Sequence, residues 1–218
     1  MEKNNREYRN MTMQIREAGE GEEERKVVVG YASTFDEPYK LYSGEGWELW
    51  ETVDRTAFDE TDMTDVIMQY DHKGRVFART RNNTLQVKPD ERGLFIEADL
   101  GGTEIGRELY EEISGGYTDR MSFGFTVTGD SEDCEQNDVG IWIYTRHIQK
   151  VGKLYDVSAV SIPANDGTSI MADAVTRSIG DLRDGVIERI QAERLEEEKR
   201  ILEQRRAEVK ARALGGNN

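Results

Sequence analysis

Ser122 lies on a strand-like segment whose two faces can be told apart by alternation. In residues 121–127 every second side chain is large and apolar, while Ser122, Gly124 and Thr126 share the other face. The hydroxyl therefore points away from the expected core, beside a residue with no side chain and after the glycine pair at 115–116. Open space around a hydroxyl suits a nucleophile that faces a substrate. A serine on a solvated sheet face has the same pattern.

His72 has the side chain best suited to take the proton of a serine hydroxyl. A neutral imidazole near pH 7 is the usual base for this step. His72 ends the strand-like segment 66–72, directly before Lys73 and Gly74. Asp71 precedes it, but neighbours on an extended strand point to opposite faces, so Asp71 is not expected to reach the ring. The carboxylate that orients the imidazole must then come from another strand, unless His72 is an ordinary surface or core residue.

Asp156 is the acid that best fits that role. It lies in residues 154–162, where its neighbours are apolar or small. A carboxylate in a buried run needs a partner. His72 is one such partner, and a structural ion pair with Arg146 or Arg120 is another, so the pattern leaves both open. His147, which lies between Arg146 and Ile148, is an alternative third member of the site.

The elements that must position these residues are mostly short strands. The hydrophobic pattern has period two from about residue 27 to residue 170, with turn residues between the segments. The expected strands are residues 27–35, 47–53, 66–72, 84–89, 94–100, 121–127, 139–148 and 154–162. So many short strands predict an α+β, mainly β fold: an antiparallel, closed or nearly closed β-barrel with a few surrounding helices.

Two further patterns are helical or turn-like. Thr103 can cap a helix in which Ile105, Leu109 and Ile113 recur at four-residue spacing, and the glycine pair at 115–116 ends it. A weaker helical turn is expected at 55–61. Residues 1–26 are polar, with one short strand around residues 11–15 and a solvated loop.

A long charged helix is expected at the C-terminal end. Residues 177–214 hold ten basic and nine acidic side chains and only a thin, irregular apolar stripe. Such a helix either is solvated with one docking stripe or binds a partner or a second copy. The expected organisation is therefore residues 1–26, a β-barrel domain at 27–176 and the helix at 177–218.

Composition excludes several classes of protein. The net charge of −15 argues against an electrostatic nucleic-acid binder. No apolar run has the length of a membrane span, and the first residues hold no hydrophobic signal region, so we expect a cytosolic chain and no membrane partner. One cysteine, Cys134, excludes an internal disulfide and a cysteine-based zinc module. Nucleotide-binding loops and the His-Glu-x-x-His motif are absent, and we expect no cofactor and no metal.

An ordered set of segments carries a resemblance to a known family. The segments are residues 30–35, 51–58, Asp71-His72, Gly93-Leu94, 122–125, 146–151 and 154–160, closing on Pro163-Ala164. They resemble the prohead (capsid maturation) proteases of tailed bacteriophages, which are serine peptidases similar in fold to herpesvirus assemblin. The resemblance covers about residues 27–172. Thr56 stands where the family has a glycine, and Asp156 stands where it more often has a glutamate.

The resemblance implies roles for three residues. Ser122 is the expected nucleophile, His72 the general base and Asp156 the orienting acid, with His147 as the alternative third member. The expected activity is that of a serine endopeptidase that cleaves the scaffolding segment of the major capsid protein, and itself. The expected place is the host cytoplasm, inside the immature capsid. The portal and a second copy of the chain are further expected partners.

Two rival functions fit the same sequence. A non-enzymatic capsid scaffolding or assembly protein that retains the protease fold accounts for every feature except the combination of Ser122, His72 and Asp156. A host cytosolic β-barrel binding module requires the resemblance to be accidental.

Overall fold

The computed structural model describes residues 6–15, 25–160 and 173–215. The chain divides into two compact units, Met1–Ile179 and Gly180–Asn218. Among the described residues, the first unit holds the sheet, one complete α-helix, a short 3₁₀ helix and the start of the C-terminal helix, and the second unit holds the rest of that helix. In the described part of the chain no helix is long and apolar enough to span a bilayer.

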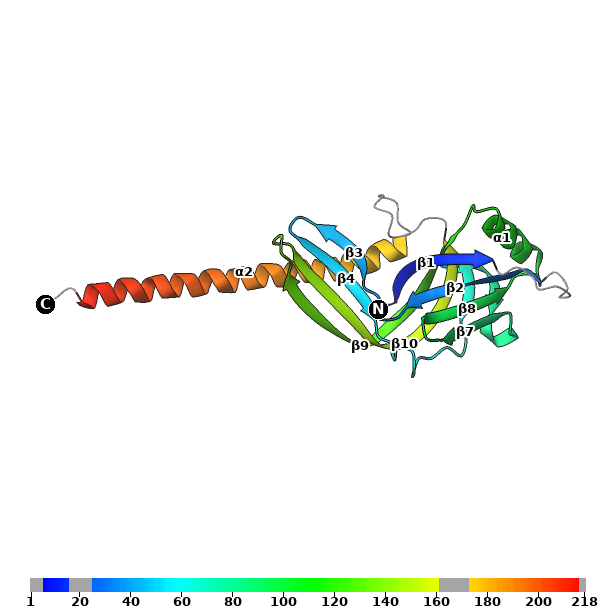
Figure 1. The fold of residues 1–218 in the computed structure, drawn as a ribbon, viewed down its shortest axis with the longest axis horizontal. Coiled ribbons are helices and arrows are strands. Elements are labelled where there is room, and N and C mark those ends of the chain that lie inside the picture. Colours follow the sequence, from blue (N-terminus) through cyan, green and yellow to red (C-terminus); the bar gives the residue numbers. More distant parts are fainter. Residues whose placement is uncertain (1–5, 16–24, 161–172, 216–218) are drawn as a thin grey trace. The chain divides into compact units, whose positions relative to one another are not determined.

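The described strands form one ten-stranded sheet (Figure 1). Along its main path the order is β3-β4-β10-β9-β1-β2-β8-β7, and β5 and β6 branch from β10. The strands are β1 (Glu7–Ile15), β2 (Val27–Thr34), β3 (Tyr39–Gly44), β4 (Trp47–Val53), β5 (Ile67–Tyr70), β6 (Lys73–Arg79), β7 (Leu85–Pro89), β8 (Gly93–Asp99), β9 (Arg120–Gln136) and β10 (Trp142–Val160). The helices are α1 (Glu104–Ser114), α2 (Asp173–Gly215) and the short 3₁₀ helix η1 (Thr80–Asn82).

The predicted closed or nearly closed antiparallel barrel is wrong, because the sheet is open and mixed. Its path ends at β3 and β7, and in the described residues neither strand pairs with a second neighbour. Both are short, and they carry Lys40, Lys88 and Pro89, residue types that discourage further pairing at an edge. Alternation shows which side chains face the core, but it does not show whether the two edges of a sheet meet.

β10 is the strand on which the sheet is built. It pairs antiparallel with β9 along most of its length, parallel with β4 through residues 142–148, and parallel with β5 through residues 156–159. The two segments predicted at 139–148 and 154–162 therefore belong to one strand, which begins at Trp142 and is described as far as Val160, while residues 161 and 162 lie outside the described residues. Register shifts near Lys150 and Leu154 let it change direction between its two parallel partners.

One hydrophobic core takes its buried residues from most of the strands, from the loops between them and from α1. Leu94 of β8, Phe123 of β9 and Val157 of β10 belong to it, together with Leu109 and Ile113 of the helix. The predicted helix is confirmed: the Thr103 hydroxyl accepts a hydrogen bond from the Gly106 N–H, and the chain leaves the helix at Gly115. The helical turn expected at 55–61 is instead a series of tight turns.

α2 is a long helix with a solvated surface over most of its described length. Every side chain described from residue 191 to residue 209 is exposed. The large apolar side chains among them are Leu195, Ile201, Leu202 and Val209.

Candidate active site

Ser122 lies where the alternation predicted, on the face of β9 opposite the core. Met121, Phe123 and Phe125 are buried in the core. Ser122 pairs across the sheet with Ser158 of β10. Ser122 is nevertheless fully buried, so this face of the sheet is covered at the serine.

His72 is in a hairpin turn and not in a strand, which corrects the prediction of a strand over 66–72. Tyr70 of β5 pairs with Lys73 of β6, which leaves Asp71 and His72 as a two-residue loop. Both have positive φ, 47° and 58°, as a tight hairpin of this length commonly requires. Because His72 lies in the turn, its imidazole does not follow the alternation of faces along a strand. The argument that Asp71 and His72 point to opposite faces therefore does not apply.

The structure brings His72 and Asp156 together. His72 Nδ1 lies 2.5 Å from Asp156 Oδ1, and both side chains are almost completely buried. The Ser158 hydroxyl donates to the same carboxylate oxygen at 2.7 Å. With Nδ1 bonded to a carboxylate, Nε2 is the nitrogen that is left to exchange a proton.

Two buried polar atoms of the site have no hydrogen-bond partner in the part of the chain that the structure describes. They are Ser122 Oγ and His72 Nε2. Buried polar groups are normally paired, because an unmade hydrogen bond in a dry site is costly. The two atoms also make no hydrogen bond with each other here. They are the pair that a serine nucleophile and its base would use.

Gly124 provides the room in which the pair of His72 and Asp156 is built. A Cβ at this position would lie 2.5 Å from Asp156 Oδ2 and 2.8 Å from Tyr8 Cε1. The sequence suggested that this glycine leaves open space beside Ser122. Instead, the space is filled by the side chains of Asp156 and Tyr8.

The cation near Asp156 is Arg6. Its Nη1 lies 3.8 Å from Asp156 Oδ2, and its guanidinium stacks over the Tyr155 ring at 3.7 Å. Neither arginine considered from the sequence has this role. Arg146 pairs with Glu7, Glu51 and Asp130, and Arg120 lies 3.5 Å from Asp119.

A buried charge cluster holds β1, the strand that carries Tyr8 and directly follows Arg6. Arg9 of β1 donates two hydrogen bonds of 2.6 Å to Glu51 of β4, and Arg146 donates to Glu7 of β1 at 2.6 and 3.0 Å. Burial alone would lower the pKa of Arg9, but the charge and hydrogen bonds of Glu51 raise it above its ordinary value. For Glu7 the signs are reversed: burial alone would raise the pKa of its carboxyl, but Arg146 and Arg9 hold that pKa below its usual range.

His147 is not part of this arrangement. Its Nδ1 bonds the Thr52 hydroxyl at 2.8 Å and its Nε2 bonds Asp133 at 3.0 Å. It precedes Asp156 by nine positions on β10, which is about 30 Å of extended strand. The structure therefore does not bring His147 to the ring of His72.

Sequence reasoning missed three residues around the site. Ser158 could have been found, because it lies two positions after Asp156 and so shares its face of the strand. Arg6 and Tyr8 gave no such signal. They reach the site only because β1 pairs with β9, which sets Tyr8 opposite Gly124.

A family model identifies what kind of protein has this site. The model of the caudovirus prohead serine proteases matches residues 11–183, which include Ser122, His72 and Asp156. The chain belongs to this family. The resemblance drawn from the sequence motifs is thereby confirmed. No curated protein and no solved structure gives a significant match to the chain.

Membership of the prohead serine protease family has consequences at the family level. It indicates a serine peptidase, supports a role in capsid maturation and implies interaction with capsid proteins. A phage protease of this kind acts inside the immature capsid in the host cytoplasm.

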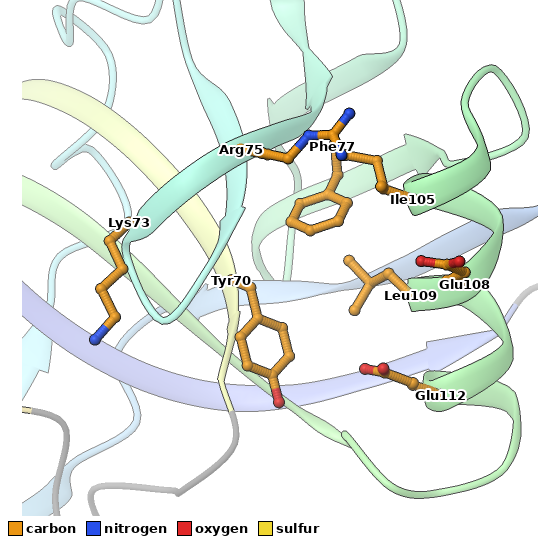
Figure 2. Close-up of a pocket in the computed structure, with 8 residues that line it drawn as sticks. All are labelled: Tyr70, Lys73, Arg75, Phe77, Ile105, Glu108, Leu109 and Glu112. Atoms are coloured by element: carbon orange, nitrogen blue, oxygen red, sulfur yellow. The ribbon is translucent and has the colours of Figure 1, made fainter.

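A pocket of about 440 Å³ lies beside the hairpin of this prohead protease, between β6 and α1 (Figure 2). Phe77 and Leu109 point into it from the two sides, and Glu108 and Glu112 follow the helix along its edge. Tyr70 and Lys73, which flank the turn that holds His72, also line the pocket. None of the three predicted catalytic residues lines it, so it is a neighbour of the candidate site and not the site itself.

Proposed function

We propose that the chain is a prohead maturation serine endopeptidase in which Ser122 is the nucleophile, His72 the general base and Asp156 the orienting acid. The observation that carries this proposal is the hydrogen bond from His72 Nδ1 to Asp156 Oδ1, formed two residue pairs along β9 and β10 from the pair of Ser122 and Ser158. A serine, a histidine and an acid in these positions have the chemical roles of a serine protease triad.

The proposed reaction is acyl transfer to Ser122 followed by hydrolysis. His72 Nε2 takes the hydroxyl proton while Oγ attacks the peptide carbonyl, and then gives the proton to the leaving amine. A water molecule activated by the same nitrogen releases the acyl group. Asp156 keeps the proton on Nδ1 and stabilises the imidazolium that forms in each step.

Ser158 supports the acid in this scheme. Its hydroxyl and His72 Nδ1 both donate to Asp156 Oδ1. Two hydrogen bonds on one oxygen hold the carboxylate in a fixed orientation, as an orienting acid requires. Arg6 adds positive charge on the side of the other oxygen.

The proposed substrate is the scaffolding segment of the major capsid protein, and the chain itself is a second substrate. Family membership supports contact with capsid proteins inside the immature capsid. Contact with the portal and self-association are further parts of the proposal. Ser122 is fully buried, so the residues that cover it must move before a polypeptide can reach the hydroxyl.

Co-expression with the major capsid protein of the same phage tests the proposal. The wild-type chain is expected to shorten the capsid protein or itself, as measured by intact mass over time, and Ser122→Ala is expected to leave both at full length. The matched control is Ser131→Ala, which changes an exposed serine farther along β9. The control is expected to cleave as the wild type does.

The non-enzymatic scaffolding function makes the opposite prediction. If proheads assemble with the chain inside while neither protein shortens, the protease proposal fails. If Ser122→Ala still cleaves, the nucleophile assignment fails.

A further inference from the structure

The imidazole of His72 has a second neighbour besides Asp156. The ring of Tyr8 lies 4.3 Å from the ring of His72, measured between centroids, in an edge-on arrangement with an interplanar angle of 66°. Aromatic rings at this separation and angle attract each other beyond the effect of burial alone. Tyr8 therefore contacts the proposed general base directly.

This contact depends on a gap in the neighbouring strand. Tyr8 of β1 is in register with Gly124 of β9, and a Cβ there would lie 2.8 Å from Tyr8 Cε1. The missing side chain lets the tyrosine ring lie across β9 toward the hairpin. The same glycine makes room for Asp156, so one position serves both neighbours of His72.

Tyr8 projects from a strand that is firmly held. The next residue, Arg9, points to the opposite face, where its two short hydrogen bonds to Glu51 are completely buried. Glu7, on the other side of Tyr8, is bound by Arg146. The backbone on both sides of Tyr8 is therefore fixed by buried charge pairs.

The hairpin that carries His72 has few such restraints. Lys73, Gly74, Arg75 and Val76 are exposed, and β6 pairs only with β5 among the described strands. The hydrogen bond to Asp156 fixes one atom of the imidazole but leaves the ring able to turn about that bond. A second contact on the ring removes this freedom.

We propose that Tyr8 is a positioning residue that holds the His72 imidazole at the angle in which Nε2 faces Ser122. The catalytic part of this inference rests on the proposed protease function. Its structural part, a restrained imidazole, does not. The aromatic ring performs the task, and the structure shows no hydrogen bond of the Tyr8 hydroxyl among the described residues.

Three variants of Tyr8 test the inference. Tyr8→Leu and Tyr8→Met remove the ring, and Tyr8→Phe keeps it. We expect the first two to lower kcat for capsid-protein cleavage by about ten- to a hundredfold with KM within about twofold, because a small misplacement of a reacting group is costly. Tyr8→Phe is expected to stay within about twofold of the wild type.

Proton NMR of the Nδ1–H of His72 gives a readout that does not need activity. The short hydrogen bond to Asp156 predicts a sharp resonance far downfield, absent from His72→Ala. The Tyr8→Leu and Tyr8→Met chains are expected to broaden or lose it, and Tyr8→Phe is expected to keep it. Far-UV circular dichroism identifies any variant that has lost its fold.

The outcomes separate this inference from the proposed function. An unchanged resonance and unchanged kcat in folded Tyr8→Leu or Tyr8→Met overturn it, and so does a Tyr8→Phe chain that behaves like Tyr8→Leu. If both ring-free variants unfold, Tyr8→Phe decides. A Tyr8→Phe chain with the resonance and the cleavage rate of the wild type supports the role of the ring, and a chain that has lost them overturns the inference. If the wild type has the resonance but cleaves nothing, the proposed function fails while the role of Tyr8 stands on the spectra.

Discussion

A single glycine decides whether the acid and the histidine can meet. Asp156 lies opposite Gly124 in the pairing of β9 with β10, and its Oδ2 occupies the volume that a side chain at residue 124 would fill. The side chain of Asp156 is shorter than the glutamate that the resembled family more often has at this position. It reaches His72 because the hairpin turn brings the imidazole over β10.

Gly124→Ala is expected to lower both stability and activity. The added methyl group would overlap Asp156 Oδ2 and Tyr8, and overpacking of this kind costs about 1–3 kcal/mol. We expect cleavage to fall by at least about tenfold, because the acid and the ring neighbour are displaced together. Urea denaturation and cleavage rates measure the two effects.

Gly129→Ala is the matched control for Gly124→Ala on the same strand. Its Cβ would meet only the side chain of Lys150, at 3.3 Å, and that side chain is mostly exposed and can move away. Stability is expected to change by no more than about 0.5 kcal/mol. Equal losses in the two variants would contradict the role given to Gly124.

At the scale of elements, the site depends on the strand β1 and on the charges that bind it. Glu51 is fully buried and accepts hydrogen bonds from Arg9, Arg146 and Tyr39. Burial, together with the negative charge of Glu51, raises the pKa of Tyr39 well above its ordinary value, so the phenol stays a donor. The cluster thus links β1, β3, β4 and β10.

Glu51→Gln is expected to destabilise the first unit by about 3–5 kcal/mol, because it leaves buried arginine charge without its partner. The control is Glu48→Gln on the same strand, whose partner Lys40 is partly exposed. Its effect is expected to stay below about 1 kcal/mol. Chemical denaturation measures both, and a small effect of Glu51→Gln would show that the cluster does not hold the sheet together.

The cluster also predicts a loss of stability in acid. The pKa of Glu7 is depressed in the folded chain, so its contribution is fully present above the ordinary value of 4.5 and is lost as the pH falls through the lower folded value. Denaturation at a series of pH values from 7 downward should show this decline. In Glu7→Gln the decline should be shallower, and an identical slope would contradict the assignment.

At the scale of the whole molecule, local patterns predicted elements better than their assembly. Alternation located β4 and the faces of β9, and capping located α1. Alternation missed β3 and β6, because each has only one buried residue and so shows no alternating apolar pattern. Alternation also does not predict how the strands pair. The register of β1 on β9 places Tyr8 beside His72, and the strand order places β3 and β7 at the edges of the described sheet.

The C-terminal helix is expected to serve assembly and not catalysis. Its described side chains from 191 to 209 are exposed, and Leu195, Leu202 and Val209 recur every seven residues, a spacing that keeps them on one side of a helix. A chain that ends at residue 190 should keep its fold and its Nδ1–H resonance but be lost from purified proheads. Quantitative mass spectrometry of proheads measures this, and normal incorporation would contradict it.

β10 is the last strand of the described sheet in chain order, and this sets the order in which the proposed site can form. His72 and Asp156 are separated by 84 positions, and in the described sheet β4 and β5 are joined to β9 only through β10. A nascent chain on the ribosome therefore has neither the acid nor the strand that aligns its neighbours. On the proposed assignment, a chain that has not been translated as far as β10 is expected to lack proteolytic activity.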